Sequence, residues 1–353
     1  MKAVIIAGGL GTRMRPLTYN RPKPVVSVAN RPFVAYQIEL LKRYGITEII
    51  LNLHYLPKNM ELLLGDGREL GVKLIYSIEK TPLGTAGAVK NAERFFDDEP
   101  LIVFNGDVLT DIDISELVSF HKKNKAKATI ALTEVEDPTA FGLVIADDTG
   151  RVSSFLEKPS WEEVTTKNIN AGIYILDPSI FKDVPSGRPY SFERELFPGL
   201  IEKGQNVFAK ASEAYWLDIG SPKKYMQAHK DILNGEVSVN IDGKDRGGNT
   251  WVHPSADISP TAKLRGPLII GNKARLSGKS CIKSFSVIGE NVSLEEGSVV
   301  EDTIILRNSK IGRDVRLKNC IIGENCIIED FVEMIYGVVL ADYSIVKKGS
   351  KLL

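Results

Sequence analysis

The chain has 353 residues, of which 43% are hydrophobic and 25% charged, as in ordinary globular proteins. This length predicts two domains rather than a single core. Lys plus Arg and Asp plus Glu each number 45, so the formal net charge is zero. A neutral chain is unsuited to bulk electrostatic binding of nucleic acid, and any anion that it binds must be held by a local site.

The first seven residues form a short apolar run that contains one basic residue and leads directly into a glycine cluster. We interpret this run as a buried first strand rather than a signal peptide, and we expect no membrane-spanning segment. The three cysteines, Cys281, Cys320 and Cys326, lack the spacing of metal ligands and are expected to be small core residues. Together these features predict a cytoplasmic protein in a reducing compartment.

Strand-like and helix-like segments alternate along the first two thirds of the chain. Apolar runs at residues 4–6, 49–51 and 101–104 are typical of strands that are covered on both faces. Residues 33–44 carry apolar side chains at helical spacing, and Ser221-Pro222 is typical of an N-cap and N1 proline that open a helix over residues 223–233. This alternation predicts an α/β domain whose Rossmann-like, mostly parallel mixed sheet has helices on both sides.

A period of six residues follows in the last hundred residues. A helix repeats near 3.6 and a strand at 2, so the spacing favours hexapeptide repeats in a left-handed parallel β-helix, with coincidentally spaced strands as the alternative. The register shifts twice, which predicts inserted or deleted residues at corners. The aliphatic residues in register are Ile258, Leu264, Ile270, Leu276, Ile282, Ile288, Leu294 and Val300, then Ile305, Ile311 and Leu317, then Ile322, Ile328, Met334, Leu340 and Val346.

These patterns predict three parts along the chain. The α/β domain is expected over residues 1–234 and the β-helix over residues 253–353. The segment between them, 235–252, is rich in glycine and charged residues and is expected to be a linker.

The first predicted strand is followed by the loop Gly8-Gly9-Leu10-Gly11-Thr12-Arg13. Glycines let backbone N–H groups approach phosphate oxygens closely, and an arginine adds a bidentate phosphate donor. A dinucleotide-binding loop would need a third glycine where Met14 stands, and a P-loop would need Gly-Lys-Ser/Thr. Taken by itself, the loop is also compatible with a structural turn.

Three further residues have the chemistry of a phosphate and metal site. Lys23 lies between Pro22 and Pro24, which deny the segment a helix and fix an extended path for one cation. Asp107 follows a buried strand, at the sheet edge where ligands of α/β proteins bind, and Asp218 is a second carboxylate. Carboxylate oxygens suit Mg²⁺, although a surface lysine and turn aspartates are the alternative interpretations.

The order of the motifs resembles that of the sugar-1-phosphate nucleotidyltransferases. The resemblance covers about residues 1–234, and an appended β-helix also occurs in that family. The motifs are Gly8 to Arg13, Pro22-Lys23-Pro24, Pro82 to Gly87, Asn105-Gly106-Asp107, Glu157-Lys158-Pro159, Asn170 to Gly172 and Trp216 to Gly220.

The resemblance implies a role for each matching residue. No Ser, Cys or His nucleophile is needed, because the sugar phosphate is itself the attacking anion. The implied roles are nucleotide binding by Gly8, Gly9, Gly11, Thr12, Gly84, Thr85 and Gly106; triphosphate binding and transition-state stabilisation by Arg13 and Lys23; Mg²⁺ binding by Asp107 and Asp218; and sugar-phosphate binding by Gly142, Glu157, Lys158 and Asn170, with Arg13, Lys23, Asp107 and Lys158 as the catalytic group.

The resemblance favours GTP and mannose 1-phosphate as substrates, with GDP-mannose and pyrophosphate as products. Pyrimidine-specific relatives typically carry a Gln in the base loop, and residues 79–88 contain none. A homo-oligomer formed through the β-helix is expected. One alternative is another nucleotide with glucose 1-phosphate or a different sugar phosphate. The others are a non-catalytic nucleotide-sugar sensor and a bifunctional enzyme whose β-helix is also an acyltransferase.

Overall fold

The computed structural model describes residues 1–352. They form two compact units, each made of two segments of the chain. The first, which we call the α/β unit, consists of Met1–Leu10 and Val34–Asp218. The second, which we call the β-helix unit, consists of Gly11–Phe33 and the chain from Ile219 onward.

The α/β unit is built on a nine-stranded mixed sheet. Its strands are β1 (Ala3–Ile6), β4 (Glu48–Leu53), β5 (Lys73–Ile78), β6 (Leu101–Asn105), β8 (Ala128–Glu134), β9 (Gly142–Ala146), β10 (Val152–Glu157), β11 (Asn168–Leu176) and β12 (Val207–Ala211). The strand order is β10-β9-β11-β6-β1-β4-β5, and β8 pairs with both β11 and β12. The strands β6, β1, β4 and β5 are parallel, whereas β11 runs antiparallel to β6 and β8. The predicted buried strands at 4–6, 49–51 and 101–104 are thus confirmed.

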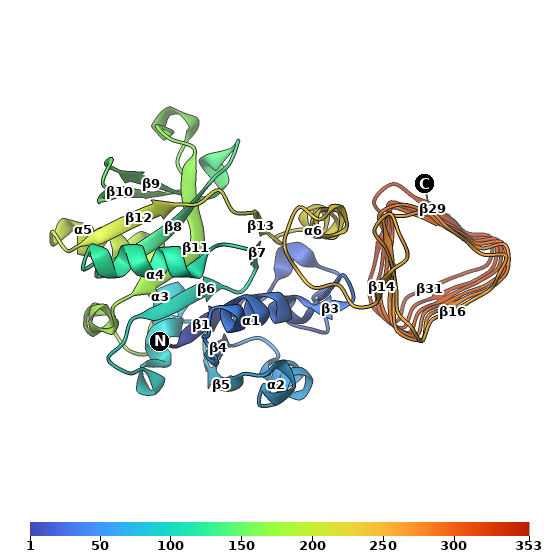
Figure 1. Ribbon diagram of the computed structural model, residues 1–353, viewed down its shortest axis with the longest axis horizontal. Coiled ribbons are helices and arrows are strands. Elements are labelled where there is room, and N and C mark those ends of the chain that lie inside the picture. The colour runs from blue at the N-terminus through green and yellow to red at the C-terminus, as the bar shows by residue number, and fades with distance from the viewer. Residues whose placement is uncertain (353) are drawn as a thin grey trace. The chain divides into compact units, whose positions relative to one another are not determined.

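Helices and short turns connect these strands. α4 packs against β8, β11 and β12 (Figure 1) and is capped by Asp113, whose carboxylate accepts a 3.1 Å hydrogen bond from Glu116 N–H. Among residues 1–352, no helix is long and apolar enough to cross a membrane. The helices are α1 (Phe33–Arg43), α2 (Pro57–Leu64), α3 (Gly84–Asn91), α4 (Ile114–Lys123) and α5 (Phe197–Glu202); the short turns are Thr12–Met14, Lys23–Val25, Arg68–Leu70, Glu93–Phe95, Pro138–Ala140, Trp161–Glu163, Pro178–Asp183 and the π-turn Phe192–Leu196.

A second, two-stranded sheet joins distant parts of the α/β unit. It consists of β7 (Val108–Thr110) and β13 (Trp216–Asp218), which pair antiparallel. β7 directly follows β6 along the chain. The pairing therefore brings β13, the last strand of the α/β unit, close to the carboxyl end of β6.

The β-helix unit contains three sheets that Figure 1 shows end-on as the sides of a triangle, and all their strands pair in parallel except β14, which is antiparallel to β15. Each side gains one short strand per coil, as the six-residue period predicts. The first side is β14 (Lys244–Asp245), β15 (Thr250–Val252), β18 (Leu268–Ile270), β21 (Ser286–Ile288), β24 (Ile304–Ile305), β27 (Ile321–Ile322) and β30 (Val339–Leu340); the second is β16 (Asp257–Ile258), β19 (Arg275–Leu276), β22 (Ser293–Leu294), β25 (Lys310–Ile311), β28 (Ile327–Ile328) and β31 (Ile345–Val346); the third is β17 (Lys263–Leu264), β20 (Cys281–Ile282), β23 (Val299–Glu301), β26 (Arg316–Lys318), β29 (Glu333–Ile335) and β32 (Lys351–Leu352).

The two register shifts are single-residue deletions at corners. Ile270 pairs with Ile288, 18 residues further on, whereas Ile288 pairs with Ile305 and Ile305 with Ile322, 17 residues further on. The shortened corners leave these isoleucines stacked in one column, and all four are fully buried. The predicted fold class, an α/β domain followed by a parallel β-helix with the hexapeptide spacing of the left-handed form, is confirmed.

The compact units differ from the predicted division at residues 234 and 253. Residues 11–33, with β2 (Ser27–Val28) and β3 (Arg31–Pro32), and α6 (Pro222–Asn234) group with the β-helix. Polar contacts explain this: Asn30 donates a 2.9 Å hydrogen bond to Ile288 O, and Lys230 on α6 pairs with Asp302. The predicted linker 235–252 also contains β14 and β15. The compact units describe packing, so the predicted domain boundaries at residues 234 and 253 stay a prediction.

Candidate active site

The glycine loop leaves the carboxyl end of β1. A Cβ atom on Gly8 would lie 3.0 Å from Glu79 Oε1 and 3.3 Å from His54 Cβ, so a larger residue there would crowd both side chains. Gly9 is exposed, and a Cβ there would meet nothing within 4 Å. Close approach to the protein explains Gly8, whereas the open space at Gly9 leaves its backbone available to a ligand.

Gly106 places Asp107 beside the end of β1. The Gly106 N–H donates a 2.9 Å hydrogen bond to Ile6 O, and a Cβ on Gly106 would lie 2.5 Å from the same oxygen. Gly106 therefore lets the turn after β6 fold tightly onto β1. Asp107 follows it, half-buried, at the edge where parallel strands end.

The small β7–β13 sheet brings Asp218 to the same edge. Asp218 pairs with Val108, the residue next to Asp107, and Trp216 Nε1 donates a 2.8 Å hydrogen bond to Ala171 O. In residues 1–352, no group of three or more His, Cys, Asp or Glu side chains could hold a metal ion. Two aspartates at one sheet edge fit a divalent cation that prefers oxygen ligands.

Glu157 and Gly142 lie opposite each other at the ends of β10 and β9. A Cβ on Gly142 would lie 2.7 Å from the Phe155 ring and 3.1 Å from Glu157 Oε2, so glycine makes room for both side chains. Burial, with a smaller contribution from Glu193, raises the pKa of Glu157. Lys158 comes next with a left-handed φ of 54°, and its side chain is exposed.

Asn170 belongs to a polar network that the sequence motifs only partly identify. It donates to Tyr174 Oη at 2.8 Å, and the Tyr174 hydroxyl donates to Glu193 at 3.3 Å. Burial, followed by the charge of Glu193, raises the pKa of Tyr174 well above its ordinary value, so Tyr174 stays a donor. Tyr174 and Glu193 stand in none of the quoted motifs, so sequence reasoning missed them.

Thr85 joins this network from α3. Its hydroxyl donates to Glu193 Oε2 at 2.8 Å and accepts from Phe192 N–H at 2.8 Å. Gly84 has a φ of +71°, and a Cβ there would lie 2.8 Å from Tyr190 O. The structure thus gives both residues contacts with the segment 190–193, and the Thr85 hydroxyl is engaged within the protein.

Glu79 is a further site residue without a role in the sequence prediction. Its side chain is 6% exposed, and Oε2 accepts a 2.9 Å hydrogen bond from Leu83 N–H. The other oxygen, Oε1, faces Gly8. Burial raises the pKa of Glu79, and the Leu83 hydrogen bond opposes that shift. The carboxylate therefore lies between the glycine loop and the turn that precedes α3.

Four predicted site residues belong to the β-helix unit. Gly11 has a φ of +61°, and a Cβ there would lie 3.2 Å from Lys23 Cβ, so the glycine lets Lys23 pack against the loop. The Thr18 hydroxyl fixes the loop by donating a 2.8 Å hydrogen bond to Gly11 O. Thr12 and Arg13 are exposed and Lys23 is half-buried. Within this unit, the structure therefore brings Lys23 to the last glycine of the loop.

Comparison with known proteins identifies the family of the chain. The family described as "Nucleotidyl transferase" matches residues 2–235, and the "GMPPB C-terminal domain" matches residues 264–352. The chain belongs to the nucleotidyl transferase family. The resemblance predicted from the motifs is thus confirmed, and this nucleotidyl transferase is an enzyme.

Individual relatives of this nucleotidyl transferase cover most of its length. It is 37% identical over 85% of its length to a Mycobacterium tuberculosis mannose-1-phosphate guanylyltransferase, 82% of which is covered. It is 33% identical over 93% of its length to a Synechocystis UTP–glucose-1-phosphate uridylyltransferase, 88% of which is covered. The solved structure of HddC from Yersinia pseudotuberculosis complexed with GMP-PN matches 64% of the chain and 97% of that structure, with 33% identity and a TM-score of 0.56.

Two of the four histidines of this nucleotidyl transferase, His121 and His229, are buried. His121 accepts or donates a 3.0 Å hydrogen bond with Thr129, and burial lowers its pKa to about 4. Burial lowers the pKa of His229 to about 3. Both rings are therefore neutral at physiological pH and contribute no charge to a phosphate site.

Proposed function

We propose that this nucleotidyl transferase forms GDP-mannose and pyrophosphate from GTP and mannose 1-phosphate. The activity in the name of the Mycobacterium tuberculosis relative supports this choice of substrates. The observation that carries the catalytic assignment is the pairing of Asp218 with Val108, which sets the two predicted metal-binding aspartates at one sheet edge.

The proposed reaction needs positioning and charge stabilisation rather than a protein nucleophile. A phosphate oxygen of the sugar phosphate attacks the α-phosphorus of the nucleotide, and pyrophosphate leaves. Arg13 and Lys23 bind the triphosphate and stabilise the charge that develops on it, whereas Lys158 holds the attacking phosphate. Glu157 and Asn170 bind sugar hydroxyls. Glu157 lies in a partly buried position, where burial raises its pKa, and its carboxyl oxygens can accept hydrogen bonds from those hydroxyls.

We assign Asp107 and Asp218 to one Mg²⁺ ion. When bound, the ion neutralises phosphate charge and lowers the barrier to attack at phosphorus. The donor set of two carboxylates without histidine or cysteine suits this hard cation better than zinc.

Glu79 supports guanine as the base. The Watson–Crick edge of guanine presents two neighbouring donors, N1–H and N2–H₂, and a carboxylate offers only acceptors. A uracil or thymine edge carries acceptors beside its single N–H, which a Gln amide matches better. The buried Glu79 carboxylate, which faces Gly8, is therefore our candidate for reading the base.

A second candidate substrate pair is UTP and glucose 1-phosphate, which the name of the Synechocystis relative suggests. Pyrophosphate release should be measured with GTP, ATP, UTP, CTP and dTTP against mannose 1-phosphate and glucose 1-phosphate. Our proposal predicts the highest kcat/KM for GTP with mannose 1-phosphate. Faster turnover with UTP and glucose 1-phosphate would favour the second substrate pair over our proposal. Tight binding of GDP-mannose without any turnover would indicate a non-catalytic nucleotide-sugar sensor.

Glu79→Gln provides the matched test of base selection. We expect this variant to lose roughly 10- to 100-fold in kcat/KM for GTP, because one guanine donor would face an amide N–H₂ group. Activity with UTP should fall less. Equal losses for both nucleotides would remove Glu79 from base selection.

We also infer that the protein works in the cytoplasm and self-associates through its β-helix. Open end coils and exposed apolar side chains on the last coils, including Phe331 and Tyr343, support self-association. Light scattering of the full chain would give its mass, and a monomer at micromolar concentration would contradict the inference.

A further inference from the structure

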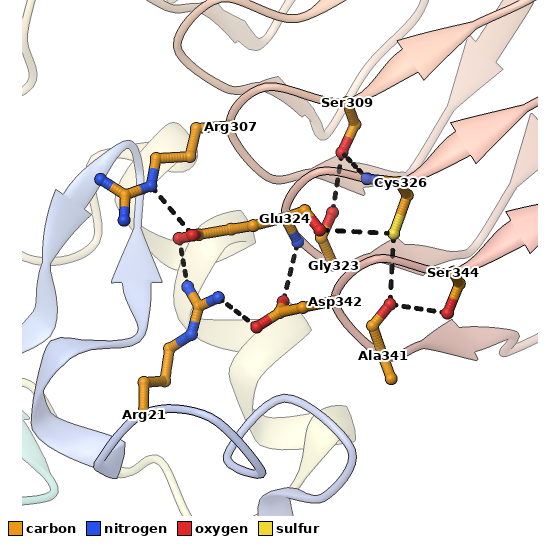
Figure 2. Close-up of polar contacts among 9 residues, drawn as sticks. All are labelled: Arg21, Arg307, Ser309, Gly323, Glu324, Cys326, Ala341, Asp342 and Ser344. Carbon is orange, nitrogen blue, oxygen red and sulfur yellow. Dashed lines mark hydrogen bonds and ion pairs between the residues drawn. The ribbon is translucent and has the colours of Figure 1, made fainter. Parts of the chain in front are cut away.

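Arg21 lies two residues before Lys23 and joins its loop to the β-helix. Its guanidinium donates from one terminal nitrogen to Glu324 and from the other to Asp342, as Figure 2 shows. The side chains of Arg21, Glu324 and Asp342 are 11%, 10% and 3% exposed. Both carboxylates are thus committed to a residue that is about 300 positions away in the sequence.

The two carboxylates occupy the same corner of successive coils. Glu324 follows β27 and Asp342 follows β30, and Asp342 Oδ1 accepts a 2.8 Å hydrogen bond from Glu324 N–H. Arg307, which follows β24 in the coil before, pairs with Glu324 at 2.9 Å. The three side chains form a ladder along this corner, and with Arg21 the cluster has two positive and two negative charges.

Hydrogen bonds hold the backbone of this corner in place (Figure 2). The Ser309 hydroxyl accepts from Cys326 N–H at 3.0 Å and donates to Gly323 O at 2.9 Å. Cys326 Sγ and Ser344 Oγ both donate to Ala341 O, at 3.2 Å and 2.7 Å. The residues before Glu324 and Asp342 are therefore fixed, so the carboxylates offer Arg21 a rigid receptor.

The link from Arg21 to Lys23 is also stiff. Pro22 and Pro24 flank Lys23 and restrict the backbone, and both are buried. The turn Lys23–Val25 is closed by hydrogen bonds from Val25 N–H to Pro22 O and from Val26 N–H to Lys23 O. Lys23 Cβ lies against Gly11, so a displacement of Arg21 would reach both the lysine and the glycine loop.

Geometry, rather than stability, explains such a cluster best. Burial by itself would lower the pKa of Arg21, but Glu324 and then Asp342 raise it, so the arginine stays charged. Buried ion pairs seldom stabilise a fold more than apolar residues of the same volume, because desolvation offsets their attraction. The planar guanidinium of Arg21 bonds a different carboxylate from each terminal nitrogen, and this fixes one arrangement of the three groups.

We propose that Arg21, Glu324 and Asp342 form a clamp through which the β-helix positions Lys23 and the end of the glycine loop at Gly11. Arg21 is a positioning residue and not a catalytic one. The clamp makes the β-helix part of the nucleotide-binding machinery. The catalytic part of this inference rests on the proposed function, whereas the ordering of the loop does not.

The ordering of the loop can be tested by amide hydrogen exchange of the full-length protein. In Arg21→Ala, Glu324→Gln and Asp342→Asn, we expect roughly tenfold faster exchange at Val25 and Val26. Arg21→Lys should give an intermediate rate, because it keeps the charge and loses the fork. The control is Lys230→Met, which breaks the partly buried 2.8 Å ion pair between α6 and Asp302 and should leave Val25 and Val26 protected.

Kinetics provide the second readout. We expect KM for the nucleoside triphosphate to rise roughly tenfold or kcat to fall by as much in Arg21→Ala and Asp342→Asn. KM for the sugar phosphate should stay unchanged. Glu324→Gln and Asp342→Asn keep the side-chain volume, so they still report if Arg21→Ala fails to fold.

Two results would overturn the clamp. One is unchanged exchange at Val25 and Val26 in all three clamp variants, and the other is an equal increase in Lys230→Met. If the wild-type protein turns over no nucleotide, the proposed function fails, but the exchange measurement still tests the clamp. Normal turnover in the wild type with unchanged kinetics in the clamp variants would contradict only the catalytic part of the inference.

Discussion

At the scale of single residues, the buried polar side chain of His229 bonds to a strained backbone position at Ala29. Its Nδ1 accepts a 3.3 Å hydrogen bond from Ala29 N–H, and its ring lies 4.6 Å from that of Tyr225. Ala29 has a left-handed φ of 46° without being a glycine. The neutral imidazole therefore helps to hold a strained turn between β2 and β3.

His229 should make the protein less stable in acid. Burial lowers its pKa to about 3, so below pH 6.5 the unfolded chain binds a proton that the folded chain does not. The free energy of unfolding should then fall with pH between about 6.5 and 3, by at most about 1.4 kcal/mol per pH unit for this one group. Urea denaturation at several pH values measures that slope, and His229→Gln should reduce it.

Tyr225→Phe is the matched control for this titration. It removes the hydrogen bond from Tyr225 to Ser27 O next to the same histidine and adds no group that titrates in this range. It should lower stability at every pH and leave the slope unchanged. A slope that is equally steep in His229→Gln and the wild type would show that His229 does not carry the acid sensitivity.

At the scale of elements, glycines set how closely strands and loops approach. Gly106→Ala places a Cβ atom 2.5 Å from the backbone oxygen of Ile6, which cannot rotate away. We expect a loss of about 1–3 kcal/mol in the free energy of unfolding, measured by chemical denaturation. Stability close to that of the wild type would mean that β1 and β6 are less tightly joined than the structure indicates.

Gly9→Ala is the contrasting substitution in the same part of the fold. A Cβ at Gly9 would meet nothing within 4 Å, so we expect stability within about 0.5 kcal/mol of the wild type. Because Gly9 is proposed to line the nucleotide, KM for GTP should rise. A change in stability without a change in KM would contradict both parts of this expectation.

The sequence predicted elements well where one physical signal dominates. Apolar runs revealed β1, β4 and β6 because these strands are covered on both faces. The strands of the small β7–β13 sheet have three residues each, which is too short for a period to appear. Motif spacing therefore identified Asp107 and Asp218, but their meeting at one edge depends on a pairing between distant segments.

The site residues that were missed show the same limit. Glu193 owes its place to contacts with Thr85 and Tyr174, more than 100 and about 20 residues away in the sequence. No local pattern marks such a residue, because its neighbours are fixed only by the tertiary fold. Glu79 was part of a quoted segment, but its burial and its closeness to Gly8 were not readable from spacing.

At the scale of the whole molecule, the β-helix was predictable and the grouping of segments was not. Every sixth residue faces the interior, so the period alone revealed the columns of aliphatic side chains. The grouping of residues 11–33 with the β-helix depends on contacts such as that between Arg21 and Glu324, 303 residues apart. The grouping of residues 11–33 with the β-helix thus depends on a few specific ion pairs, which the six-residue period does not reveal.

Two neighbouring isoleucines of β28 test the columns. Ile328 is 1% exposed and Ile327 is 41% exposed, although both belong to the same strand. We expect Ile328→Ala to lower the free energy of unfolding by about 2–5 kcal/mol, because it leaves a cavity between stacked coils. Ile327→Ala should change it by less than about 0.5 kcal/mol. Equal losses in thermal or chemical unfolding would contradict the inward and outward assignment.

The central claim is that Asp107 supports Mg²⁺-dependent transfer of a guanylyl group to mannose 1-phosphate. The most direct measurement is mass-spectrometric detection of GDP-mannose formed from GTP and mannose 1-phosphate with Mg²⁺, by the wild type and by Asp107→Asn. We predict product with the wild type and at least about a 100-fold slower rate with the folded variant. No GDP-mannose from the wild type, or equal rates from both proteins, would contradict the claim.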